Sequence, residues 1–341
     1  MGKINVAIIG LGRLGASVGL ALKRYNKRSD AKHDFDVLGV EDRASVAKDA
    51  EKIGAVNKSV RNLYDGVRNR DIIVLALPYA DVRRTYQAIG KDIRAGGVVL
   101  DMSPVKLPSL GWAKEFLPDE VHMVGVTSII NPIYLFDGLD NTKDAHEDFF
   151  DNGNMMLMPS PSCIREAVEL ASDFSALLGG KPHFMDPAEH DSLFAATSSL
   201  PAVLGVLSFY MLARNPGWDD LQRLTNPDFG RVTHHLYDTH PDDLRDIWLH
   251  NQDSLLRYTD GMIEALQSFR EVLAAKDRVA LEALLVESAD HYSGWINRRH
   301  NNKWDDRSNP SAPTAGQTIM SSLMGGFLAN RVGGGKNHRD E

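Results

Sequence analysis

Short apolar runs alternate with amphipathic stretches along the first half of the chain. Each run holds four to six residues, and helix-like sequence separates it from the next. Strands that are buried on both faces of a parallel sheet have this continuous apolar character, and helices usually connect them. The pattern therefore predicts an α/β domain on a parallel sheet, with strands at residues 5–9, 37–40, 72–77, 98–101, 122–125 and 155–158.

After Pro187 the pattern changes to longer helical stretches. In one of them the apolar residues recur every three or four positions, which places them on one helix face: Leu255, Tyr258, Met262, Leu266, Phe269 and Leu273. The apolar stretch 200–213 contains Pro201 and Gly205 and is shorter than the ~20 residues that span a bilayer, so we interpret it as a buried helix. We expect an all-α second domain.

A glycine-rich turn stands between the first strand and the first helix, in residues 4–24, INVAIIGLGRLGASVGLALKR. Gly10 permits a tight turn, Gly12 lets the backbone approach a pyrophosphate, and Gly15 lets the helix pack closely on the strand. Free N–H groups at the helix N-terminus favour an anion there. We expect a Rossmann-type domain that binds a nicotinamide or flavin dinucleotide, rather than a purely structural turn, through Gly10, Leu11, Gly12, Arg13, Leu14 and Gly15.

Two further segments extend the predicted cofactor site. Glu41 and Asp42 follow the second strand, where a carboxylate accepts hydrogen bonds from the adenosine ribose and repels the 2′-phosphate of NADP. Arg43 weakens this preference for NAD, because an arginine at this position can pair with the 2′-phosphate of NADP. The alternative is that Arg43 is a solvated side chain of a charged turn. We expect NAD, with NADP as the alternative. Leu77 and Pro78 end the third strand at the carboxyl edge of the sheet, where open α/β folds bind ligands.

The amino-acid composition limits which partners the protein is expected to bind and in which cellular compartment it is expected to lie. The 341 residues carry 38 Lys and Arg against 46 Asp and Glu, a formal net charge of -8, which argues against a nucleic-acid or anionic membrane surface. The single Cys163 excludes an intrachain disulfide, and the first strand follows Met1 too closely for a signal peptide. We expect a cytoplasmic protein. The spacing of His234, His235, His240 and His250 does not favour a metal site.

Five landmarks in order resemble the prephenate dehydrogenase family. They are the turn GLGRLGASVGLAL, the strand DIIVLALP, the segment DMSPVK at 101–106, the segment DPAEHD at 186–191 followed by Ser-Leu-Pro, and the Asp-x-x-Arg at 228–231. The resemblance implies an NAD(P)-dependent dehydrogenase that oxidises and decarboxylates prephenate or arogenate in tyrosine biosynthesis. It also implies a nucleotide-binding domain at 1–186 and a helical substrate and dimerisation domain at 187–300. Residues 301–341 read as a loose tail with an apolar piece at 319–328.

The resemblance also assigns roles to particular residues. Arg231 matches the arginine that holds the substrate carboxylate, and Lys106 and Ser103 match the segment that lines the pocket near the nicotinamide. His190 matches a histidine that faces the cleft. We expect a small-molecule carboxylate as substrate and a homodimer, because the helical half carries more apolar surface than one such domain buries.

The family's catalytic histidine is absent. Asn131 stands where the Gly-x-His-Pro histidine accepts the substrate hydroxyl proton, and an amide cannot accept that proton at neutral pH. The segment 198–202, SSLPA, likewise lacks two family histidines. Three interpretations stay open: His190 is the base while Asn131 only positions the hydroxyl, the enzyme acts on a different small acid, or the chain is a non-catalytic NAD-binding relative.

Overall fold

A computed structural model describes residues 2–137 and 141–304. The apolar piece predicted at 319–328 and nearly all of the predicted tail lie outside these residues. The described chain divides into two compact units between Glu282 and Ala283. The first unit contains the whole sheet and most of the helices, so the predicted domain boundary at residue 186 lies inside it and stays a prediction.

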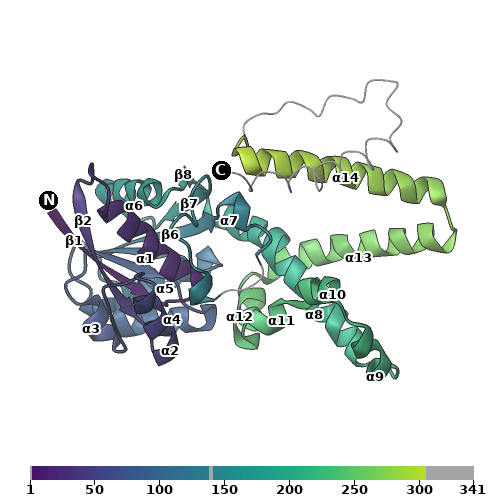
Figure 1. Ribbon diagram of the computed structural model, residues 1–341, viewed down its shortest axis with the longest axis horizontal. Helices are drawn as coiled ribbons and strands as arrows, with labels where there is room; N and C mark the ends of the chain where they lie inside the picture. Colours follow the sequence, from purple (N-terminus) through teal and green to yellow (C-terminus); the bar gives the residue numbers. More distant parts are fainter. Residues whose placement is uncertain (1, 138–140, 305–341) are drawn as a thin grey trace, which may run out of the picture. The chain divides into compact units, whose positions relative to one another are not determined.

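An eight-stranded sheet forms the centre of the first half, in the order β3-β2-β1-β4-β5-β6-β7-β8 (Figure 1). All six predicted strands are present. The sequence pattern missed two short ones, β3 and β8, whose side chains are exposed or half-buried and therefore lack an apolar run. The bounds are β1 (Gly2–Ile9), β2 (His33–Val40), β3 (Lys58–Val60), β4 (Ile72–Leu75), β5 (Val98–Asp101), β6 (His122–Ile129), β7 (Asn154–Pro159) and β8 (Lys181–Phe184).

The sheet is mixed, which corrects the prediction of a purely parallel one. β7 pairs antiparallel with β6, while every other neighbouring pair of strands is parallel. The described part of the connection from β6 to β7 contains only the short 3-10 segments η2 (Pro132–Tyr134) and η3 (Thr142–Asp144). A parallel pairing needs a long crossover, usually a helix, and the described residues between β6 and β7 form none, so β7 runs antiparallel to β6.

Helices cover both faces of the sheet. Alternate residues of β1 enter different cores: Val6 and Ile8 pack with α1 and α6, whereas Ala7 and Ile9 pack with α4 and α5. Because successive strand side chains point to opposite faces, a continuous apolar strand serves both cores. The helices are α1 (Arg13–Asn26), α2 (Ala44–Lys52), α3 (Leu63–Val67), α4 (Tyr79–Ile89) with η1 (Gly90–Asp92), α5 (Lys106–Phe116) and α6 (Arg165–Leu178).

The described residues after β8 form helices and no strand, as predicted. They are α7 (Pro187–Phe194), the π-helical η4 (Ala195–Ser199), α8 (Leu200–Ala213), α9 (Trp218–Leu221), η5 (Gln222–Leu224), α10 (Pro227–Thr233), α11 (His235–Asp238), α12 (Pro241–His250), α13 (Gln252–Ala274) and α14 (Arg278–Asn301). The predicted apolar stripe lies on α13. Leu255 at its start is buried, but Leu266, Phe269 and Leu273 are exposed.

Helix α8 is not the buried helix that its composition predicted. Only Ala202 and Gly205 are buried, and Leu207, Tyr210 and Met211 are exposed. The helical run is also longer than the apolar stretch in the sequence, because α7 and η4 continue into α8 over 27 residues, Pro187–Ala213. By length and composition alone this run could cross a membrane, and only 22% of its most apolar window is buried. A single chain therefore leaves a large apolar helix face uncovered.

Candidate functional site

The glycine-rich turn has the geometry that its sequence predicts. Gly10 has a φ of +92°, and a Cβ atom there would lie 2.2 Å from the carbonyl oxygen of Ala76. A Cβ atom at Gly15 would lie 2.0 Å from the carbonyl oxygen of Gly10, so α1 packs directly on the turn. A Cβ atom at Gly12 would meet nothing within 4 Å. Since Gly12 also caps α1 without a side chain, the helix N-terminus faces open space.

Leu11 and Arg13 are held by partners distant in sequence. The Leu11 N–H donates to Glu41 Oε2 at 3.1 Å, and its carbonyl accepts from Thr142 Oγ1 at 2.7 Å. Arg13, which was predicted to bind the cofactor, is buried and turned toward the chain after β6: its guanidinium donates to the Asp144 carbonyl and pairs with Asp137. Arg13 thus stabilises the segment that packs against the turn.

Glu41 is buried, and its carboxylate is fully engaged. Besides Leu11, it accepts hydrogen bonds from the backbone N–H, Nε and a terminal nitrogen of Arg43. Burial opposes ionisation, but the bonds from Arg43 and Leu11 leave the pKa of Glu41 below its ordinary value. Glu41 is therefore an ionised group that joins β2 to the glycine-rich turn, and Asp42 beside it is exposed.

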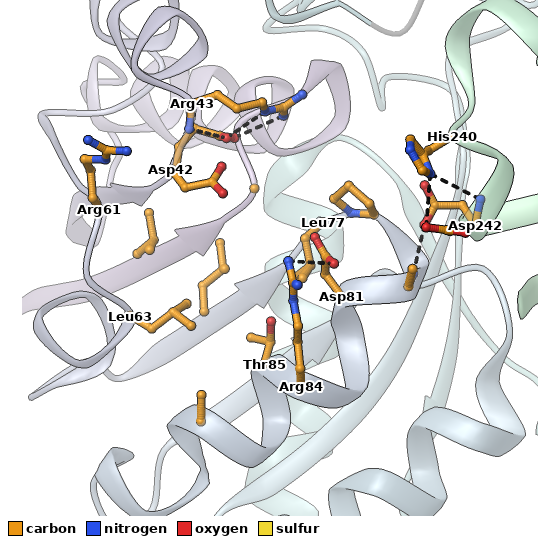
Figure 2. Close-up of a pocket in the computed structure, with 18 residues that line it drawn as sticks. Asp42, Arg43, Arg61, Leu63, Leu77, Asp81, Arg84, Thr85, His240 and Asp242 are labelled. Carbon is orange, nitrogen blue, oxygen red and sulfur yellow. Dashed lines mark hydrogen bonds and ion pairs between the residues drawn. The ribbon is translucent and has the colours of Figure 1, made fainter.

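A pocket of about 700 Å³ opens beside the turn (Figure 2). It brings together Gly10, Glu41, Asp42, Leu77 and Pro78, five of the predicted cofactor residues. Asp42 approaches the pocket from the end of β2 and the Arg84–Asp81 ion pair from α4. The sequence patterns did not indicate the remaining charged and histidine residues of the lining, which are Arg61, Asp81, Arg84, His240, Asp242 and Asp243.

Helix α12 supplies one wall of the pocket. Asp243 Oδ1 accepts from the backbone N–H of Ala80 at 2.8 Å, in the first turn of α4. The N-cap residue of α4, Pro78, provides no side-chain hydrogen bond, so Asp243 takes the place of a local cap. Burial raises the pKa of Asp243. Tyr79 Oη also lies 3.0 Å from Nδ1 of His250 at the end of α12.

The Lys106 side chain, which was predicted to bind the substrate, is engaged inside the protein. Its side chain is fully buried, and Nζ donates to the backbone carbonyls of Asp101, Ser103 and Val126. An ammonium group has three N–H donors, and all three are used here. Burial lowers the pKa of Lys106 to about 8, against the opposing effect of Asp101 and Asp191. Lys106 therefore ties the ends of β5 and β6 together.

Ser103 and Asn131 are also engaged within the protein. Ser103 is buried, and its Oγ lies 2.8 Å from Ser109 Oγ in α5. The Asn131 side chain caps its own loop: Oδ1 accepts from Ile133 N–H at 3.2 Å, and Nδ2 donates to the Asp148 carbonyl at 3.1 Å. The structure therefore gives Asn131 a local structural contact at both ends of its amide.

Arg231 lies apart from the residues described so far. Its side chain on α10 is 77% exposed and pairs with Asp228 of the same helix at 2.8 Å. Arg231 is not among the residues that line the pocket beside the glycine-rich turn. No group of three or more histidine, cysteine or acidic side chains within the described ranges could hold a metal ion.

His190, which was predicted to be catalytic, belongs to a series of hydrogen bonds that joins α7 to β6. Its Nε2 lies 2.8 Å from Thr127 Oγ1 on β6, and its Nδ1 lies 2.9 Å from Asp191 Oδ1. Asp191 also accepts from the backbone N–H groups of Lys106 and Leu107, at 2.8 and 2.9 Å, and so caps α5. Sequence reasoning missed Thr127, because it lies 63 positions from His190.

Comparison with known proteins covers both halves of the chain. Residues 18–183 match the family described as prephenate dehydrogenase, nucleotide-binding domain, and residues 186–287 match prephenate dehydrogenase, dimerization domain. Among curated proteins, cyclohexadienyl dehydrogenase of Zymomonas mobilis is 25% identical over 283 residues, covering 80% of this chain and 89% of that protein. Prephenate dehydrogenase of Bacillus subtilis is 23% identical over 296 residues, covering 86% and 76%.

Solved structures share the fold. Prephenate dehydrogenase from A. aeolicus, in complex with hydroxyphenyl propionate and NAD+, has a TM-score of 0.71 and 19% identity, covering 86% of this chain and 99% of that one. Synechocystis arogenate dehydrogenase has a TM-score of 0.63 and 19% identity, covering 86% and 100%. At this identity the likeness supports the architecture: an α/β nucleotide-binding domain followed by a helical dimerization domain.

Proposed function

The chain belongs to the prephenate dehydrogenase family, and from this premise we propose that it oxidises and decarboxylates prephenate or arogenate with a nicotinamide dinucleotide. The products are 4-hydroxyphenylpyruvate and tyrosine respectively, which places the enzyme in tyrosine biosynthesis. The observation that carries the proposal is the match of both halves, because a nucleotide pocket alone fits many dehydrogenases. Two distant curated relatives support this choice of substrates.

We propose NAD as the cofactor. The open space at Gly12 and the uncapped start of α1 fit a pyrophosphate, whose charge the helix N-terminus stabilises. Asp42 is exposed at the pocket, and a carboxylate at the end of the second strand accepts hydrogen bonds from the adenosine ribose in such folds, whereas the Glu41 carboxylate is already engaged. When bound, the nicotinamide accepts a hydride. The NAD+ complex of the A. aeolicus neighbour supports the same cofactor.

A dehydrogenase of the same fold for a different small acid is the second candidate. It is favoured by the contacts of Lys106, Ser103 and Asn131, whose polar groups are engaged inside the protein. Arg231 is exposed in the single chain. The glycine-rich turn and its pocket therefore retain the geometry of a nucleotide site. The four residues predicted to contact the substrate, Lys106, Ser103, Asn131 and Arg231, instead contact other groups of the protein. A changed substrate accounts for this asymmetry.

We propose a homodimer formed through the helical half. The region matched by the dimerization domain includes α8 and α13, and both helices expose large apolar side chains in the single chain. Association covers such faces, as expected for an obligate interface. The same association explains why Pro187–Ala213 is apolar and little buried without placing it in a membrane. We propose a cytoplasmic location.

The test is an assay of nicotinamide reduction with prephenate and arogenate, run with NAD and with NADP, beside a calorimetric titration of each cofactor. We expect turnover of one of the two acids and tighter binding of NAD. Binding of NAD without turnover of either acid would favour the changed-substrate enzyme or a non-catalytic relative. Failure to bind either dinucleotide would contradict the proposed function altogether.

A further inference from the structure

Thr127, His190 and Asp191 form a continuous hydrogen-bonded chain that joins β6 to α7. The Thr127 Oγ1 to His190 Nε2 distance is 2.8 Å, and the His190 Nδ1 to Asp191 Oδ1 distance is 2.9 Å. The His190 and Asp191 side chains are buried, and Thr127 is half-buried at the end of the series. The three groups have the order hydroxyl, imidazole, carboxylate.

The contacts of Asp191 determine the direction of the hydrogen bonds. Its carboxylate accepts from two backbone N–H groups, those of Lys106 and Leu107, so both of its oxygens act as acceptors. An ionised carboxylate is only an acceptor, so His190 donates from Nδ1 and keeps a lone pair on Nε2. Thr127 then donates its hydroxyl proton to Nε2. The lone pairs of Oγ1 are thereby left to accept a proton from another group.

The position of Thr127 places this oxygen at the ligand edge of the sheet. Asp101, the last residue of β5, pairs with Gly125, so Thr127 lies two residues beyond the parallel pairing of β5 and β6. Ligands of open α/β sheets bind at the carboxyl ends of the strands. The Asn131 amide, predicted to position the substrate hydroxyl, is instead bonded to its own loop.

We propose that Thr127 accepts the proton of the substrate ring hydroxyl and passes its own proton to His190, with Asp191 as the positioning residue. This inference rests on the proposed function. The base expected at position 131 is thus replaced by a relay from a neighbouring strand and helix. Thr127 is the catalytic residue of the relay, because it contacts the reacting hydroxyl, and His190 stores the proton.

The step balances over one turnover. The ring hydroxyl proton moves to Thr127 Oγ1 while the threonine proton moves to His190 Nε2, and the C–H electron pair leaves as a hydride to the oxidised nicotinamide. A ring carbonyl forms. The bond to the ring carboxylate then breaks, carbon dioxide leaves, and its electron pair aromatises the ring to a phenolate. His190 returns the proton through Thr127 to give the phenol, so the relay ends neutral.

The carboxylate of Asp191, in contact with His190, favours this proton storage. Asp191 lies beside it on α7, and the fully buried Lys106 ammonium and Asp101 lie on the adjoining α5 and β5. Asp191 stabilises the imidazolium directly, while Lys106 is held by backbone carbonyls.

The experiment compares Thr127→Val with Thr127→Ser. Valine keeps the shape of threonine and removes the hydroxyl, so we expect kcat to fall by about 10²-fold or more, the typical contribution of a general base, with little change in KM. Serine keeps the hydroxyl and should retain kcat within about tenfold of wild type. His190→Gln removes the acceptor of the threonine proton and should also lower kcat by about 10²-fold. A Thr127→Val variant that keeps more than half of the wild-type kcat would overturn the relay.

A second measurement does not depend on turnover. Nitrogen NMR of the dehydrogenase should show that His190 carries its proton on Nδ1 and that Nε2 is unprotonated. Thr127→Val should shift the Nε2 resonance, because it removes the hydrogen bond to that nitrogen. Protonation at Nε2 instead would overturn the relay, because Thr127 would then be the acceptor. If wild type turns over neither acid, the proposed function fails while this tautomer is still tested. If wild type is active and Thr127→Val is equally active, only the relay fails.

Discussion

The carbonyl oxygen of Gly10 and the α-carbon of Gly15 are so close that a Cβ atom at Gly15 would lie 2.0 Å from that oxygen. Gly12, between them, has no neighbour within 4 Å of the corresponding position. Two glycines of one motif therefore have different roles. Gly15 allows the helix to pack on the turn, and Gly12 keeps space clear for a ligand.

Gly15→Ala and Gly12→Ala should therefore separate folding from binding. Gly15→Ala forces backbone atoms apart, and we expect it to lower the free energy of unfolding by about 1–3 kcal/mol. Gly12→Ala should leave the melting temperature within a few degrees of wild type and weaken NAD binding by about tenfold or more. Thermal unfolding and calorimetric titration measure the two effects. Equal loss of stability in both variants would contradict this division.

Asp42 and Arg43 should influence cofactor choice in opposite directions. Asp42→Asn removes a negative charge from the pocket, so we expect NADP affinity relative to NAD to rise by about three- to tenfold. Arg43→Ala removes the cation nearest to Glu41 and frees that carboxylate, so the same ratio should fall by a similar factor, about three- to tenfold. Titrations with both dinucleotides give the ratio. A change of the same sign in both variants would contradict this assignment.

Lys106→Met should destabilise the protein, because three buried carbonyls lose their donor. We expect a loss of about 2 kcal/mol in the free energy of unfolding near neutral pH. The folded-state pKa of about 8 lies below the ordinary 10.5, so the unfolded chain binds more protons between these values. The contribution of Lys106 to stability therefore rises as the pH increases through that window.

Denaturant unfolding of wild type and Lys106→Met at several pH values measures this contribution as a difference. Other groups that titrate in the same range, including tyrosines, affect both proteins and cancel. We expect the stability advantage of the wild type to grow from pH 8 toward 10.5. A difference that stays constant or shrinks over this range would show that Lys106 keeps its proton in the folded protein.

Leu266→Glu should weaken the homodimer. Leu266 is 54% exposed in the single chain and lies on the apolar stripe of α13, so a carboxylate there would be buried without a partner on association. Gln267→Glu adds the same charge one position along the helix and serves as the matched control. We expect light scattering to give a dimer mass for wild type and Gln267→Glu, and a smaller mass for Leu266→Glu. A monomeric wild type would contradict the proposal.

Much of the fold follows from local sequence patterns. The six apolar runs became strands, and the stripe from Leu255 to Leu273 became one face of α13. Burial on both faces of a sheet and the helical period leave a direct pattern in neighbouring residues. The antiparallel β7 did not follow, because strand direction depends on the connection after β6. The exposure of α8 did not follow either, because composition does not say what covers a helix.

The sequence by itself determined the glycine-rich turn. Gly10, Gly12 and Gly15 are required by the backbone conformation and close contacts of the turn, which involve mainly residues near them in the chain. Only the tertiary structure decided which polar side chains are available for chemistry. Lys106 matches a pocket-lining motif, yet its three donors meet carbonyls of β5, β6 and the loop between β5 and α5. His190 meets Thr127 from a strand 63 positions earlier. A hydrogen-bonding group is satisfied by whatever the fold places beside it, and that partner is not encoded in its own neighbourhood of the chain.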